Sequence, residues 1–184
     1  MTRQSHLAGK RVLIVDDEED ILATLADLLE GAVTDPARDH AAALAKIRRN
    51  RYDLAILDIM GVDGLKLLEE TVAAGIPTVM LTAHAVSAET LMESIRKGAI
   101  AYVPKETLAD LADLLNDLLE AQLRGEPPWK LLFDRMGEFF DRRFGPGWKN
   151  TDAAFWSEFN RTHEVGKGIQ ARLMHDPRIR DKGV

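Results

Sequence analysis

Short runs of apolar residues alternate with amphipathic stretches up to about residue 123. The runs lie at 12–15, 54–57, 78–81 and 101–103, with a weaker one at 32–34. The strong runs are apolar at successive positions, which is typical of strands that a parallel sheet buries on both faces. The pattern therefore predicts five short strands, four of them buried on both faces.

The stretches between these runs have helical periodicity. Leucines at 108, 111, 114, 115, 118 and 119 give the clearest stripe, and Asp39 stands where a helix N-cap is expected. Strand–helix alternation repeated five times predicts an α/β fold, a doubly wound five-stranded parallel sheet. The leucine stripe is interpreted first as core.

The pattern breaks at residues 124–128, which contain the consecutive prolines Pro127 and Pro128. Proline cannot continue a helix, and it pushes the preceding residue toward extended conformations. We therefore predict a first domain over 9–123, a linker at 124–128, a small C-terminal helical extension over 129–160, and a polar tail over 161–184 whose composition is compatible with disorder. The aromatic residues of the extension are interpreted as a helical hairpin packed on the first domain or on a second copy, in preference to a cofactor site.

Composition excludes several classes of protein. The chain has no cysteine, so a disulfide framework and a cysteine-ligated metal site are ruled out. No apolar run approaches the roughly 18 residues needed to cross a bilayer, and the polar N-terminus has no signal-peptide core, so we expect a cytoplasmic protein with no membrane partner. Residues 1–124 carry a net charge of −8 and residues 125–184 a net charge of +2, which does not favour a nucleic-acid surface.

Polar side chains follow four of the predicted strands. Asp16 and Asp17 follow the first strand, Asp58 the third, Thr82 the fourth and Lys105 the fifth. Ligands of open α/β sheets bind beyond the carboxyl ends of the strands, so we expect these groups to converge. Clustered carboxylates repel one another unless a cation intervenes, and hard oxygen ligands suit Mg²⁺. This chemistry indicates a Mg²⁺-assisted aspartyl phosphorylation site.

Four segments around these residues resemble the receiver domains of two-component response regulators, the chemotaxis-regulator-like family. They are VLIVDDEED at 12–20, YDLAILDIMGVDGLKLLE at 52–69, IPTVMLTAHA at 76–85 and KGAIAYVPK at 97–105. They occur in the family's order and cover roughly residues 9–123. The resemblance implies a flavodoxin-like receiver fold.

The resemblance also implies the parts of a metal and phosphoryl site. Asp58 matches the phospho-acceptor and a Mg²⁺ ligand. Asp17 matches a direct Mg²⁺ ligand, and Asp16 a ligand acting largely through water. The backbone carbonyl of Met60 matches the remaining protein ligand.

Other matched positions imply residues that pass on the conformational change and residues that set the lifetime of the phosphoryl group. Thr82 matches the hydroxyl that moves to the phosphoryl group, Tyr102 the aromatic switch residue that follows it, and Lys105 the phosphate-binding lysine. The side chains of Met60 and His84 match positions that tune the lifetime of the phosphoryl group. Taken alone, His84 is more readily interpreted as an exposed loop residue.

The sequence departs from the family in two loops. The segment from Asp58 to Gly64 is about two residues shorter than usual, and we expect Gly61 to relieve the tighter turn. Proline precedes Lys105 instead of following it, and Glu106 follows it. We therefore expect the loop after the fifth strand to differ from the family's. Glu18, Glu19 and Asp20 are interpreted as acids at a helix start.

The function expected from the resemblance is a phosphorylation-controlled switch that receives its phosphoryl group from a histidine kinase or a phosphotransfer protein. Its only chemistry would be acceptance and loss of that group, so it would not count as an enzyme. The family often dimerises through its last helices, which leaves a homodimer open. The alternatives are a DNA-binding regulator with an atypical effector, a Mg²⁺-dependent aspartyl phosphatase, and a receiver that is no longer phosphorylated. Nucleic acid is not an expected partner, because no basic recognition helix stands out.

Overall fold

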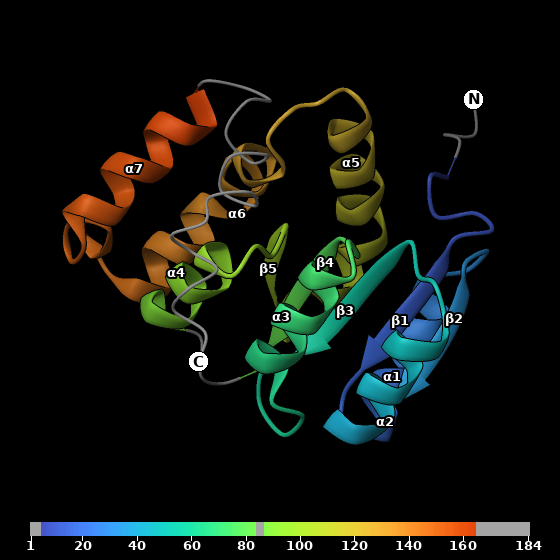
Figure 1. Ribbon diagram of the computed structural model, residues 1–184. Helices are drawn as coiled ribbons and strands as arrows, with labels where there is room; N and C mark the ends of the chain where they lie inside the picture. The colour runs from blue at the N-terminus through green and yellow to red at the C-terminus, as the bar shows by residue number, and fades with distance from the viewer. Residues whose placement is uncertain (1–4, 84–86, 165–184) are drawn as a thin grey trace. The chain divides into compact units, whose positions relative to one another are not determined.

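A computed structural model describes residues 5–83 and 87–164 of the chain (Figure 1). Five parallel strands form one sheet in the order β2-β1-β3-β4-β5. Their bounds are β1 Arg11–Val15, β2 Val33–Ala37, β3 Leu54–Asp58, β4 Thr78–Thr82 and β5 Ala101–Pro104. Helices flank the sheet, so the predicted α/β class and the five-stranded parallel sheet are confirmed.

Four strands are buried along their length, as the successive apolar positions predict, and they include β5 at one edge of the sheet. Every residue of β3, β4 and β5 is buried, and β1 is exposed only at Arg11. The edge strand β2 is half exposed and contains Pro36. Proline is tolerated at a sheet edge because no ladder bond is required of its nitrogen. Strand β2 begins at Val33 and runs three residues beyond the predicted apolar run, because pairing with β1 outweighs the weak strand propensity of Asp35 and Pro36.

Four helices alternate with the strands: α1 Glu19–Leu28, α2 His40–Arg49, α3 Gly64–Ala73 and α4 Ala88–Arg96. Side-chain caps begin two of them, α2 and α4. Asp39 accepts a hydrogen bond from the backbone N–H of Ala42 at 2.7 Å, as expected of an N-cap. Ser87 caps α4 in the same way through the N–H of Thr90. A 3-10 helix, η1 Lys105–Asp110, follows β5 directly and leads into α5 Leu111–Leu123.

The chain divides into two compact units, residues 1–117 and 118–184. The division falls inside α5, because this helix runs unbroken to Leu123. Residues 124–127 of the predicted linker connect α5 to α6. Helix α6 spans Pro128–Phe144 and begins at the second of the two prolines, one residue before the predicted start of the extension. The second unit continues with η2 Trp148–Asn150 and α7 Ala153–Glu164.

Aromatic rings form the interior of the second unit. Phe133 contacts Trp129, Phe140, Trp148, Trp156 and Phe159, with ring centroids 5.7–6.5 Å apart. Edge-to-face pairs of this kind stabilise a small core beyond the area that they bury. Helix α7 continues through residue 164, past the predicted end of the extension at 160. The rest of the predicted polar tail lies outside the described residues.

None of the helices within 5–83 and 87–164 combines the length and the hydropathy that a membrane span requires.

Candidate functional site

Three aspartates converge at the carboxyl ends of β1 and β3. Asp16 and Asp17 directly follow β1, and Asp58 is the last residue of β3. Each offers a carboxylate oxygen within 4.8 Å of the other two. Asp16 and Asp58 are 0% and 3% exposed, whereas Asp17 is exposed. The adjacent parallel register of β1 and β3 produces this convergence.

The Lys105 side chain enters the same cluster from the end of β5. Its ammonium lies 2.7 Å from Asp16 Oδ2, 3.0 Å from Glu18 Oε1 and 3.2 Å from Asp58 Oδ1. No peptide bond among the described residues is cis, and η1 begins at Lys105 itself. Lys105 therefore reaches the acids without a following proline.

The cluster perturbs the protonation of its members. Burial raises the pKa of Asp58 to about 6, and repulsion by Asp16 adds to this effect. Burial also raises the pKa of Asp16, against the hydrogen bond from Lys105. For Lys105, burial acts to lower the pKa, but hydrogen bonds to Asp16 and Glu18 outweigh it and raise the value. A buried carboxylate pair of this kind is stabilised by positive charge.

The shortened loop after Asp58 depends on two glycines. Gly61 has a φ of +75°, and a Cβ placed on it would lie 2.6 Å from carboxyl atoms of Asp17. A Cβ on Gly64 would lie 1.9 Å from the Asp58 carbonyl oxygen. Between them Asp63 has a φ of 53°, in the left-handed region. The loop thus approaches the acids too closely for a side chain at either glycine.

A chain of hydroxyl groups leads from the end of β4 to α4. Tyr102 is completely buried, and its hydroxyl lies 2.8 Å from Thr90 Oγ1 on α4. Thr90 Oγ1 in turn lies 3.1 Å from the hydroxyl of Ser87, the N-cap of α4. Burial raises the pKa of Tyr102, whereas hydrogen bonds with Thr90 and Thr82 oppose the rise. Thr82 is 1% exposed at the end of β4, so the chain connects the rim of the site to α4.

The residues of the cluster fit a divalent metal ion. The donors are carboxylate oxygens, which Mg²⁺ prefers, and they lie close enough to share one ion. The exposed position of Asp17 leaves one side of the cluster toward solvent. An ion held there would keep waters that a phosphate oxygen can replace.

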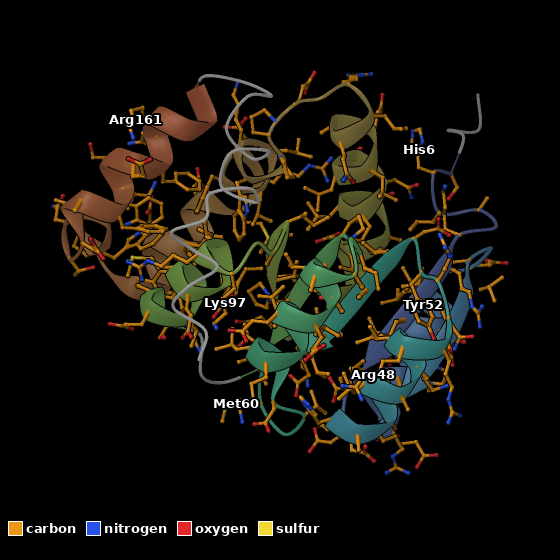
Figure 2. All side chains as sticks on the ribbon, viewed as in Figure 1. His6, Arg48, Tyr52, Met60, Lys97 and Arg161 are labelled. Atoms are coloured by element: carbon orange, nitrogen blue, oxygen red, sulfur yellow. The ribbon has the colours of Figure 1, made fainter. Side chains whose placement is uncertain are left out.

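The structure brings Asp16, Asp17, Asp58 and Lys105 together, with Thr82 at the end of the adjacent strand β4. Met60 lies in the loop after β3 with its side chain 62% exposed (Figure 2). The role of its carbonyl as a metal ligand stays a prediction. His84 lies outside the described residues.

Two contacts of this site were not predicted from the sequence. Glu18 was assigned to a helix start, yet it reaches the Lys105 ammonium. Thr90 was given no role, yet it holds the hydroxyl of Tyr102. The acid run was the only signal for Glu18, and nothing in the local sequence marks Thr90.

The sequence of the first unit is similar to that of known response regulators. The family described as response regulator receiver domain matches residues 12–118. Nitrogen assimilation regulatory protein NtrX of Azorhizobium caulinodans is 38% identical over 107 residues, which are 54% of this chain and 23% of that protein. DNA-binding response regulator MtrA of Mycolicibacterium smegmatis is 34% identical over 112 residues, 54% of this chain and 48% of that protein. The chain thus spans about half or less of these relatives.

Solved structures agree with the sheet and its flanking helices. A CheY-like response regulator receiver domain protein from Methanospirillum hungatei has a TM-score of 0.57 at 31% identity, over 64% of this chain and 98% of that one. NtrX from Brucella abortus, crystallised with ADP, has a TM-score of 0.56 at 36% identity, over 63% of this chain and 28% of that one.

Proposed function

Because this chain belongs to the response regulator receiver domain family, we propose that it accepts a phosphoryl group on Asp58 in a Mg²⁺-dependent reaction and acts as a conformational signalling switch. The observation that carries the proposal is the convergence of Asp16, Asp17 and Asp58 within 4.8 Å, with the Lys105 ammonium 3.2 Å from Asp58. Two of these acids are buried, so their charge requires a cation.

The proposed donor is a phosphohistidine of a histidine kinase or phosphotransfer protein. A carboxylate oxygen of Asp58 attacks phosphorus, the new O–P bond forms as the N–P bond breaks, and the imidazole nitrogen leaves with the electron pair and takes a proton. Mg²⁺ held by Asp16, Asp17 and Asp58 would supply charge that stabilises the transferring oxygens. The acceptor must be ionised to attack, and the nearby ammonium of Lys105 favours that form.

In this proposal Lys105 also binds the phosphoryl group after its transfer to Asp58. Its ammonium contacts three carboxylates, and a phosphoryl group on Asp58 would bring oxygens within its reach. Exchange of carboxylate contacts for phosphoryl contacts would stabilise the phosphorylated form. The movement of Lys105 and of the Thr82 hydroxyl toward the group is the local event that the switch requires.

The hydroxyl chain is the proposed route to the output surface. A shift of Thr82 toward the phosphoryl group would change its bond with Tyr102, and through Thr90 the position of α4. Phosphorylation would then bias two forms of the β4–α4–β5 surface, which a partner or a second copy reads. We propose no catalysis beyond acceptance and loss of the group, and a cytoplasmic location as for other response regulators.

The proposal is tested by incubation of the full chain with acetyl phosphate, with and without Mg²⁺, followed by intact mass measurement. The wild type is expected to gain one phosphoryl group only with Mg²⁺, and Asp58→Asn none. Equal labelling of both proteins, or of neither, would overturn it. Sustained release of phosphate over many turnovers would instead assign the aspartyl phosphatase activity.

A DNA-binding output is the second candidate, and one comparison favours it. MtrA of Mycolicibacterium smegmatis is named a DNA-binding response regulator, which runs against the expectation that nucleic acid is not a partner. The match covers 48% of that protein. A salt-dependent gel shift of a random-sequence duplex by the full chain, absent from residues 1–124 alone, would support this output.

A further inference from the structure

The ammonium of Lys149, in the second unit, lies against three aromatic rings. Its Nζ is 5.2 Å from the ring centroid of Phe133, 5.4 Å from that of Trp148 and 5.6 Å from that of Trp156. Each distance is within the about 6 Å over which a ring face attracts a cation. Three faces therefore share one positive charge.

The three rings belong to different elements, and Trp156 stands at a steep angle to the other two. Phe133 is on α6, Trp148 on η2 and Trp156 on α7. The indoles of Trp148 and Trp156 are 5.0 Å apart at 89°, and Phe133 meets Trp156 at 72°. Packing of the second unit fixes this arrangement, because Trp148 and Trp156 are only 5% and 6% exposed. The result is a corner of ring faces rather than a flat stack.

The ring faces of Phe133, Trp148 and Trp156 form a corner, called the ring corner below, which holds this charge without an acid from residues 5–83 or 87–164. Within the described part of the chain, no carboxylate forms an ion pair with Lys149. The buried indole N–H of Trp156 also has no hydrogen-bond partner there, whereas that of Trp148 donates to Asp141 Oδ1 at 2.8 Å. Buried polar groups of native proteins are nearly always hydrogen-bonded, so an unpaired donor calls for an explanation.

We propose that this ring corner is a binding site for a methylated ammonium group, with Lys149 as its intramolecular occupant. A quaternary ammonium is more weakly hydrated than the Lys149 ammonium, so it loses less on transfer to the ring faces, and aromatic cages recognise such groups. The proposed ligand class is a small quaternary ammonium compound of the choline type.

Lys149 sets the apparent affinity of the site. A ligand can bind only in the fraction of molecules whose ring corner Lys149 has left, so the dissociation constant rises in inverse proportion to that fraction. Occupation by Lys149 for about nine-tenths of the time corresponds to a roughly tenfold weaker binding. Removal of the Lys149 side chain should therefore strengthen binding and not abolish it.

Intrinsic fluorescence reports on this site directly, because the chain's three tryptophans are Trp129, Trp148 and Trp156, all in the second unit. The full chain is titrated with tetramethylammonium chloride and with choline chloride, with sodium chloride at equal ionic strength as the blank. Lys149→Ala is expected to show saturable quenching with an affinity about tenfold above that of the wild type. Lys130→Ala, which removes an exposed lysine from α6, should behave as the wild type.

A second variant separates binding from loss of the fold. Phe133→Leu in the Lys149→Ala background removes one ring face, and it should lose the quenching while circular dichroism keeps the helical signal. If neither the wild type nor Lys149→Ala responds to tetramethylammonium or choline beyond the sodium blank, the proposal is overturned and Lys149 only caps the aromatic core. Equal affinity of both proteins would contradict the role of Lys149 as occupant.

Discussion

The Glu18 carboxylate lies 3.0 Å from the Lys105 ammonium, and it is the exposed one of the three carboxylates that Lys105 contacts. Asp16 and Asp58 are buried parts of the cluster, whereas Glu18 has a side chain 61% exposed. In the proposed reaction, Glu18 would therefore compete with an incoming phosphoryl group for the same ammonium.

Glu18→Gln should speed phosphorylation. The substitution removes the competing charge and retains the shape of the side chain. An exposed ion pair contributes at most about 1 kcal/mol, so the rate of labelling by acetyl phosphate should rise about two- to fivefold. Glu19→Gln is the matched control, because Glu19 is 78% exposed and pairs with Arg38 instead. A slower reaction of Glu18→Gln would show that Glu18 assists the transfer.

Gly61→Ala should weaken Mg²⁺ binding. The new Cβ would lie 2.6 Å from the Asp17 carboxyl group, which would have to move. Displacement of a group that positions a ligand commonly costs ten- to a hundredfold in metal affinity, so we expect at least about a tenfold loss. The measurement is the increase in melting temperature as Mg²⁺ is added.

Gly75→Ala separates that clash from the backbone cost. Gly75 has a φ of +72°, close to the +75° of Gly61, but a Cβ there would meet no atom within 4 Å. Both variants should lose about 1 kcal/mol of stability from the left-handed backbone. Added Mg²⁺ should raise the melting temperature of Gly61→Ala less than that of the wild type, and that of Gly75→Ala as much as that of the wild type. An equal increase for the two variants would show that a Cβ at position 61 does not disturb Asp17.

The hydroxyls of Thr90 and Tyr102 should stabilise the fold as a pair. Thr90→Val and Tyr102→Phe each remove one partner of a part-buried 2.8 Å bond. Each should cost about 1–2 kcal/mol, and the double variant should cost less than both together by about 0.5–1.5 kcal/mol. Urea unfolding followed by circular dichroism gives the three values. Additive costs would mean that the two hydroxyls do not interact.

The network around Asp35 should make stability depend on acid pH. Burial acts to raise the pKa of Asp35, but hydrogen bonds from Lys46 and Tyr52 outweigh it and lower the value. A carboxyl whose folded pKa is depressed stabilises the fold above its unfolded pKa, near 3.8, and loses this contribution as pH falls through the folded pKa. Asp35→Asn should therefore lower stability at pH 7 by about 1 kcal/mol, with the difference from wild type closing below pH 3.8.

The control for this prediction is Asp27→Asn, at an exposed acid on α1. The free energy of unfolding of Asp27→Asn should stay close to that of the wild type across the same pH range. A constant difference between Asp35→Asn and wild type from pH 7 downward would mean that the network does not depend on the charge of Asp35.

The apolar runs were sufficient to predict the sheet, and the strand ends to predict its acidic rim. Both follow from local chemistry, since a buried parallel strand needs successive apolar residues and its end must carry the polar groups. Strand β2 was only partly predicted, because its residues at 35 and 36 favour turns and pairing with β1 decides their conformation.

Contacts between side chains far apart in the sequence could not be predicted from sequence patterns. Glu18 and Lys105 are 87 positions apart, and only the folded sheet brings them together. The Thr90 hydroxyl meets Tyr102 across two elements. For Lys149, a lysine beside a tryptophan gives no sign that two further rings face its ammonium.

The position of the phosphoryl group in the chain decides whether Asp58 is the acceptor. The protein is treated with acetyl phosphate and Mg²⁺, the acyl phosphate is reduced with borohydride, and the peptides are mapped by mass spectrometry. Reduction should convert Asp58 alone to homoserine, and chelation of Mg²⁺ should abolish the conversion. Homoserine at another aspartate, or a yield at Asp58 that does not depend on Mg²⁺, would contradict the claim.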